Sequence, residues 1–114
     1  VQETAGDEAE EEYEYEGDPG FVIPDSSTRY LTEADIVTLS DWEKKIARNE
    51  IYARHGRIFV TQSIVDYFNS KSWYQGTVDP DTFDAQQGSI FNEYEIANIQ
   101  KIEEWEMLKR AAGN

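Results

Sequence analysis

Hydrophobic side chains recur with a helical period through the middle of the chain. Over residues 40–56 they fall on two faces of a helical wheel, Ile46 and Ala53 on one face and Ala47 and Ile51 on the other. A Ser-x-x-Glu capping box opens this stretch. A helix with two apolar faces is packed on both sides, so the pattern predicts a long central helix.

Capping signals place three further helices on the chain. Thr32 and Asn92 each stand three residues before an acid, an arrangement in which the two side chains satisfy amides of the first turn. They predict a short helix after Thr32 and a last helix from Asn92 to about Arg110. Thr61 is the expected cap of a third helix that ends near Ser70.

Glycine and proline mark where the helices end. Gly56 is a left-handed stop for the central helix. Residues 75–90 contain Gly76, Pro80 and Gly88 and show no hydrophobic period, so we expect a long irregular loop there. Together these signals predict an all-α fold of about four helices.

Charge divides the chain into two parts. Residues 1–28 contain ten acids and no Lys or Arg, whereas the other 86 residues contain fourteen acids and ten bases. A run of like charges with few aliphatic side chains cannot offset its ordering entropy. We therefore expect a disordered acidic leader over residues 1–28 and a helical domain over residues 29–110. Such acidity also argues against nucleic acid as a partner.

Several kinds of chemistry have no support in the sequence. There is no cysteine, which excludes disulfides and thiolate metal sites. No apolar run approaches the roughly 18 residues of a membrane span, so we expect no direct membrane insertion by this segment. The chain has one histidine and neither a G-x-S-x-G nor an H-E-x-x-H motif. We therefore expect no catalysis, no cofactor and no metal.

Part of the central helix resembles a known family. Residues 52–56 read Tyr-Ala-Arg-His-Gly, the string from which the YARHG domain takes its name. The resemblance covers roughly residues 29–106 in the expected order. The residues that carry it outside the string are Tyr30, Leu31, Asp35, Ile36, Leu39, Ser40, Phe59, Tyr67, Phe68, Trp73, Tyr74, Phe91, Asn92, Glu95, Asn98, Ile99 and Ile102.

The resemblance implies a location and a general role. YARHG domains are extracellular modules of bacterial lipoproteins and membrane-anchored proteins, without established catalytic residues. We therefore expect a non-catalytic cell-surface module, anchored through a segment upstream of Val1, that binds a cell-wall polymer or a surface protein. The alternative is a structural spacer or oligomerising domain of a larger anchored protein.

Three cations stand at the end of the central helix, namely Arg54, His55 and Arg57. Two guanidiniums and an imidazole can hold a carboxylate or phosphate, which makes them the candidate ligand-binding residues. The alternative is structural, because cations at a helix C-terminus interact favourably with its dipole and with nearby acids. The internal partners would be Glu50, the helix carbonyls, and Glu95 or Asp66.

Two asparagines, Asn49 and Asn98, interrupt apolar stripes on their helices. Because a buried amide without partners is costly, we expect both to bond loop backbone such as residues 75–90.

The acids and aromatics admit two further readings. Asp79, Asp81 and Asp84 fit a calcium loop poorly, because Phe83 takes a ligand position and no Gly follows it, so we expect a solvated acidic loop. Some aromatic residues could form a sugar platform, although a domain this small needs them in its core. These aromatics are Trp42, Phe68, Trp73, Tyr74 and Trp105.

Overall fold

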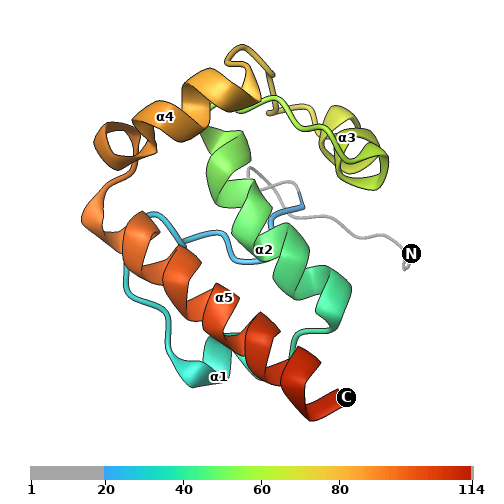
Figure 1. The fold of residues 1–114 in the computed structure, drawn as a ribbon, viewed down its shortest axis with the longest axis vertical. Helices are drawn as coiled ribbons and strands as arrows, with labels where there is room; N and C mark the ends of the chain where they lie inside the picture. Colours follow the sequence, from blue (N-terminus) through green and yellow to red (C-terminus); the bar gives the residue numbers. More distant parts are fainter. Residues whose placement is uncertain (1–19, 114) are drawn as a thin grey trace.

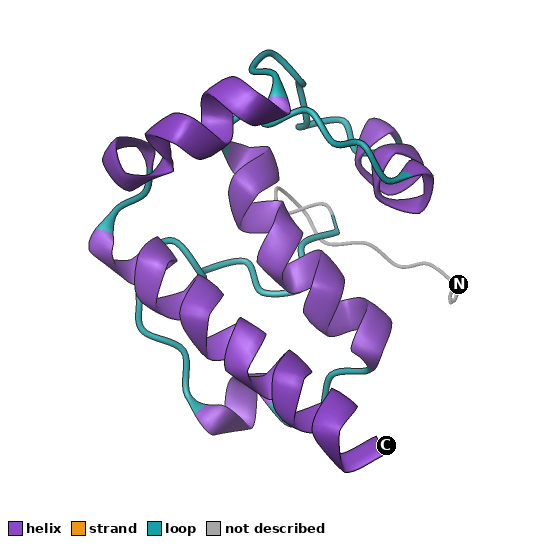
Figure 2. Ribbon diagram, viewed as in Figure 1, coloured by secondary structure: helices purple, strands orange, loops and turns teal. Residues whose placement is uncertain are grey.

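The computed structural model describes residues 20–113, so most of the expected acidic leader lies outside the described residues. Within this part of the chain there are five helices and no strand (Figures 1 and 2), which confirms the all-α class. The helices are α1 (Glu33–Ile36), α2 (Asp41–Arg54), α3 (Gln62–Asn69), α4 (Pro80–Ile90) and α5 (Glu93–Gly113). No helix among residues 20–113 is both long and apolar enough to cross a membrane.

Helix α2 begins and ends where its sequence predicts. The Ser40 hydroxyl accepts from the Glu43 N–H at 3.1 Å, and the Glu43 carboxylate accepts from the Ser40 N–H at 2.9 Å. At the other end Gly56 has a φ of 85°. A Cβ on Gly56 would lie 2.7 Å from the Thr77 hydroxyl. Backbone conformation and lack of space both require glycine here.

The core consists of three hydrophobic clusters, and α2 contributes to all of them. Ala47 packs with side chains of α1 and α5, whereas Ile46 and Ala53 pack with α3. Ile51 belongs to the third cluster, with α4 and α5. The predicted two-sided packing of this helix is therefore confirmed, and Figure 1 shows α2 crossing the middle of the molecule beside α5.

The loop expected over residues 75–90 is wrong from residue 80 onward, where the chain forms α4. Asp79 caps this helix by accepting from the Thr82 N–H at 3.0 Å, and Pro80 occupies its first turn. Only one α4 side chain, Phe83, is fully buried. A helix held by one core residue has no apolar period, which is why the pattern failed to indicate it.

Residues 20–31, which we call the strap, pass behind α2 in Figure 1 and pack against it. Ile23 and Leu31 lie in the cluster shared by α1, α2 and α5, and Ser26 is fully buried. The packed domain thus begins before residue 29, where the charge pattern placed its start. The reason is that the aliphatic side chains at the start of the strap interrupt the acidic run and enter the core.

Candidate functional site

Arg54, the first predicted ligand-binding residue, holds the strap. Its guanidinium donates to the Ser26 hydroxyl at 2.7 Å, the Ser27 hydroxyl at 2.9 Å and the Ile23 carbonyl at 2.9 Å. It also lies 3.6 Å from the Glu50 carboxylate, the partner expected one turn earlier in the helix. The N–H donors of Arg54 therefore hold the strap against α2.

Glu50 is the acceptor at the centre of the same contact. Its two carboxylate oxygens accept from the Val22 N–H at 3.0 Å and the Ile23 N–H at 2.9 Å. The side chain is completely buried. Burial raises its pKa to about 7, and the two backbone donors and the nearby Arg54 guanidinium only partly oppose this rise.

His55 meets Glu95, as the structural alternative expected. His55 Nε2 lies 2.9 Å from Glu95 Oε2, and the Ser27 hydroxyl donates to the same oxygen at 2.7 Å. These are the residue types of a catalytic triad in the wrong order, since a triad needs the histidine between the serine and the acid. The cluster instead ties the strap to the ends of α2 and α5.

Arg57 points to a different partner from the other two cations. Its guanidinium forms a bidentate pair with Asp84 of α4, with both distances 2.9 Å. The pair lowers the pKa of the Asp84 carboxyl. Asp66, one of the acids expected to take part, accepts instead from Gln62. Arg54 and His55 therefore join one internal network through Ser27 and Glu95, whereas Arg57 contacts Asp84. An anion site formed by all three residues remains a prediction.

The two asparagines have different fates. Asn98 is buried, accepts from the Leu31 N–H at 2.9 Å, and donates to the Ser26 and Arg29 carbonyls at 2.8 Å each. Its partner is a loop backbone, as expected, but the loop is the strap. Asn49 is half-buried and donates only to the Lys45 carbonyl within its own helix, so the expectation for it is wrong.

The acids and aromatics mostly serve the fold. Asp79 and Asp84 are occupied as the α4 cap and the Arg57 partner, and no group of three or more metal-binding side chains occurs among the described residues. Phe68 is fully buried, and Trp73 and Tyr74 pack against its cluster. These aromatics do not form an exposed platform.

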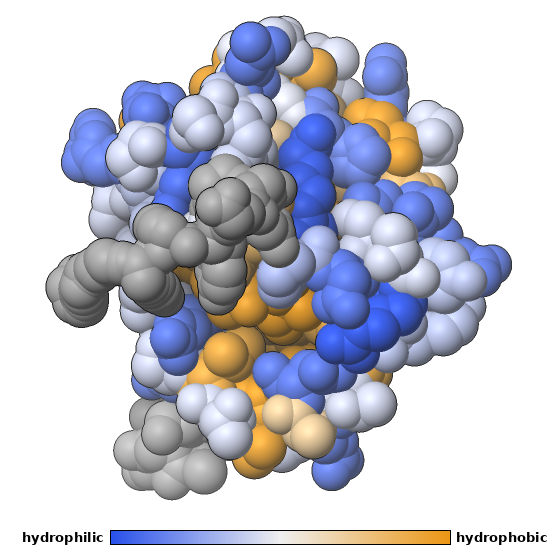
Figure 3. Space-filling model, turned by 180° about the vertical axis from the view of Figure 1, so that it is seen from behind, coloured by the Kyte–Doolittle hydropathy of each residue, from blue (hydrophilic) through white to orange (hydrophobic). Residues whose placement is uncertain are grey.

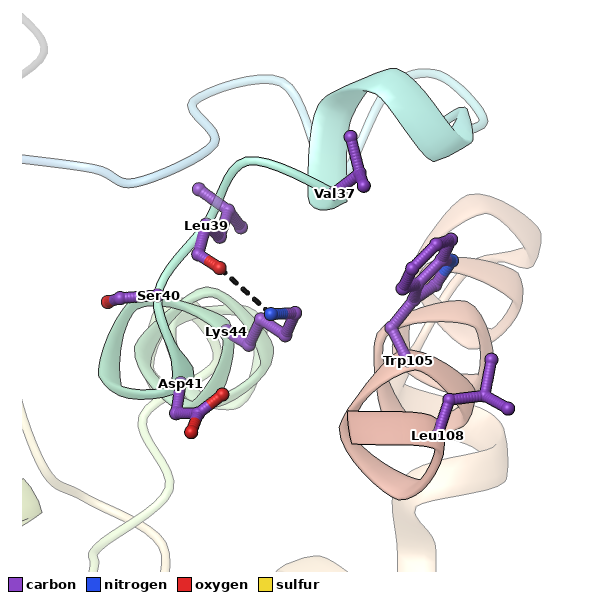
Figure 4. Close-up of a pocket in the computed structure, with 7 residues that line it drawn as sticks. All are labelled: Val37, Leu39, Ser40, Asp41, Lys44, Trp105 and Leu108. Carbon is purple, nitrogen blue, oxygen red and sulfur yellow. Dashed lines mark hydrogen bonds between the residues drawn. The ribbon is translucent and has the colours of Figure 1, made fainter. Parts of the chain in front are cut away.

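A pocket of about 560 Å³ opens at the opposite end of α2, between α1 and the C-terminal half of α5 (Figure 4). It is lined by Val37, Leu39, Ser40, Asp41, Lys44, Trp105 and Leu108. Val37 and Leu108 are 52% and 59% exposed, so both add apolar surface to the opening. Figure 3 shows hydrophobic side chains gathered in the middle and lower part of the face behind that of Figure 1, the level of α1.

Lys44 provides the positive charge in this pocket. The residue is only 6% exposed, and its ammonium donates to the Leu39 carbonyl at 2.8 Å. Among the residues that the structure describes, it forms no ion pair. An ammonium has three donors, so two have no protein acceptor among the described residues. Figure 4 shows the Lys44 nitrogen turned back toward the Leu39 carbonyl, with Trp105 and Leu108 on the far side of the opening and Asp41 on the side away from Val37.

The position of Lys44 on the helical wheel is a signal that could have identified it from the sequence. On the helical wheel Lys44 continues the stripe of Ala47 and Ile51, so an ammonium stands where a core side chain is expected. Glu50 likewise falls between the two apolar faces of the helix. A charge within an apolar stripe indicates either a buried pair or a candidate site; Glu50 is paired with Arg54, whereas Lys44 has no such pair among the described residues.

The fold and these contacts define a small helical domain closed by an N-terminal strap. A family model described as the YARHG domain matches residues 19–107, which is most of the chain, and the chain therefore belongs to this family. The match includes the strap as well as the string at residues 52–56. A comparison with curated proteins and one with solved structures found no match.

Proposed function

We propose that this domain is a non-catalytic binding module of a bacterial extracellular protein, and that it binds through the pocket around Lys44. Membership of the YARHG family is consistent with an extracellular module. The observation that carries the proposal is the buried Lys44, which has one backbone acceptor among the described residues and lines an open, apolar-walled pocket. Ligand pockets in proteins have volumes of about 300 to 1,000 Å³, a range that includes this one.

The order of the polar residues supports binding over catalysis. Because Glu95 stands between Ser27 and His55, the imidazole cannot take the serine proton. The serine oxygen also accepts from Arg54, which fixes its position within the strap. The polar cluster of Ser27, His55 and Glu95 therefore has a structural role in holding the strap.

The partner we propose is a cell-wall polymer or a surface protein that presents an apolar group, and the parent protein is anchored at the membrane. The exposed aliphatic walls of the pocket, Val37 and Leu108, suit such a group. A spacer needs no open pocket of this kind. This difference separates the proposal from the spacer alternative.

A sedimentation assay with purified peptidoglycan and with wall polymer tests the proposal. Leu108→Asp places a charge in the pocket wall, whereas Met107→Asp places the same charge on the neighbouring residue, which is 64% exposed and does not line the pocket. We expect saturable binding by the wild type and by Met107→Asp, and a loss of about ten-fold or more in Leu108→Asp.

The same assay contains the contradicting outcomes. Absence of binding by the wild type would favour the spacer, and equal binding by both Asp variants would remove the pocket from the site. Arg57→Gln belongs in the series, because loss of binding in that variant alone would locate the site at the end of α2.

A further inference from the structure

The chemistry of the pocket specifies a ligand class, an inference that rests on the proposed function. We propose that the pocket binds an aliphatic monocarboxylate. In this arrangement the carboxylate pairs with the Lys44 ammonium, and the hydrocarbon part lies against Val37, Trp105 and Leu108.

The hydrocarbon part is suggested by the walls. Val37 comes from the turn after α1, and Trp105 and Leu108 come from successive turns of α5. Figure 4 shows the Val37 and Trp105 side chains lying toward each other from their two elements, with Leu108 one turn further along α5 and extending to its other side. An alkyl chain between them would remove exposed aliphatic surface from water, which is the main source of affinity for a small ligand.

The carboxylate is suggested by Lys44. Lys44 has no counter-ion among the described residues, and a single carbonyl does not neutralise the charge of a buried ammonium. Its two remaining donors match the two oxygens of a carboxylate. The apolar surroundings strengthen that attraction relative to water.

The charge of the ligand is limited to one by the rest of the surface. Asp41 lines the same pocket, and the chain carries a net charge of −14. A ligand with two or three negative charges would meet repulsion from Asp41 and from the overall field. One carboxylate on an apolar body satisfies Lys44 with the least repulsion, and a phosphate does not.

Isothermal titration of the full chain with three probes of equal length tests this assignment. The probes are sodium octanoate, octan-1-ol and octylammonium chloride. We expect octanoate to bind about ten-fold or more tightly than octanol, because a charge-assisted contact is stronger than a neutral one, and octylammonium to bind least. Lys44→Met should remove the preference for octanoate while octanol still binds, and Leu108→Asp should weaken both.

The comparison among probes on the wild type does not depend on any variant folding. Octanol binding as tightly as octanoate, or octylammonium binding most tightly, would overturn the carboxylate assignment and leave the pocket as the site. No binding of any probe, together with Leu108-dependent wall binding, would overturn the ligand class while the proposed function stands. Failure of both assays would reject both.

Discussion

The buried charged residues at the two ends of α2 differ in how many bonding partners they have. At the C-terminal end, Glu50 and Arg54 form an ion pair, and both also form hydrogen bonds with the strap. At the N-terminal end, Lys44 is also buried but has a single backbone acceptor among the described residues. The first arrangement builds the fold. The second leaves bonding capacity unused, and unused capacity in a pocket is what a ligand requires.

Because of this difference, the string at residues 52–56 serves the fold, and the proposed binding pocket lies at the other end of α2. Arg54 and His55, two polar residues of that string, fix the strap and α5. Breaking a buried, paired charge is strongly destabilising, because the partner is left uncompensated. Removing a buried charge that has no partner leaves no such uncompensated group. Substitutions at the two ends of α2 should therefore change the free energy of unfolding differently.

The largest effect should come from the asparagine that holds the strap. Asn98→Ala removes three hydrogen bonds and leaves the Leu31 N–H and two strap carbonyls without their partner. We expect a loss of about 4 kcal/mol in the free energy of unfolding, measured by urea denaturation, because each unsatisfied buried group costs about 1 to 3 kcal/mol.

Asn49→Ala is the matched control, since it removes the same side chain from a helix where the amide bonds only to its own backbone. Its free energy of unfolding should change by less than about 0.5 kcal/mol. Equal losses in the two variants would contradict the idea that the strap is fixed by these specific bonds.

Glu50 predicts a pH dependence of similar origin. Burial raises its folded-state pKa from 4.5 to about 7, so the folded protein binds this proton more tightly than the unfolded chain does. The resulting stability is complete below pH 4.5 and is lost as pH rises through 7. The free energy of unfolding should therefore fall by as much as about 3 kcal/mol between pH 5 and pH 8, measured by urea denaturation.

Glu50→Gln separates this group from the general repulsion of an acidic chain. Gln cannot ionise, so the pH dependence over that window should become much shallower. Asp35 and Asp84, whose pKa values are lowered by their arginine partners, lose their contribution only at lower pH. An unchanged pH profile in Glu50→Gln would show that the carboxylate titrates elsewhere.

The helices were largely predictable because their ends are written in local chemistry. Ser40 and Gly56 bound α2 as expected, and Asn92 caps α5 by exchanging bonds with Glu95. Helix α4 was missed although Asp79 and Pro80 form a cap and first turn. That local signal was present, and the absence of an apolar period hid it.

The site was harder to predict because it depends on distant pairings. The Arg54–Glu50 and His55–Glu95 contacts were among the alternatives, and both occur. Nothing local shows that residues 20–31 return to α2, or that Arg57 meets Asp84. The pocket needs α1 and α5 to meet beside Lys44, a contact that no spacing along the chain encodes.

An exposed ion pair should have a smaller effect than the buried network. The Arg57 and Asp84 side chains are 18% and 50% exposed, so solvent screens their attraction. A double-mutant cycle with Arg57→Gln and Asp84→Asn should give a coupling of about 0.5 to 1 kcal/mol in the free energy of unfolding. A coupling of several kcal/mol would place this pair with the strap network.

The smallest change in stability should come from Lys44→Met, although that residue is among the most buried charges of the domain. Methionine keeps the length and apolar stem of lysine, and it removes an ammonium whose burial is poorly compensated. The lost bond to the Leu39 carbonyl opposes this gain, so the free energy of unfolding should change by less than about 1 kcal/mol. A urea titration that shows a loss of about 3 kcal/mol would mean that Lys44 is an architectural residue like Glu50. Near-neutral stability together with lost octanoate binding would instead show that the ammonium is maintained for its ligand, since selection tolerates such charges at functional sites.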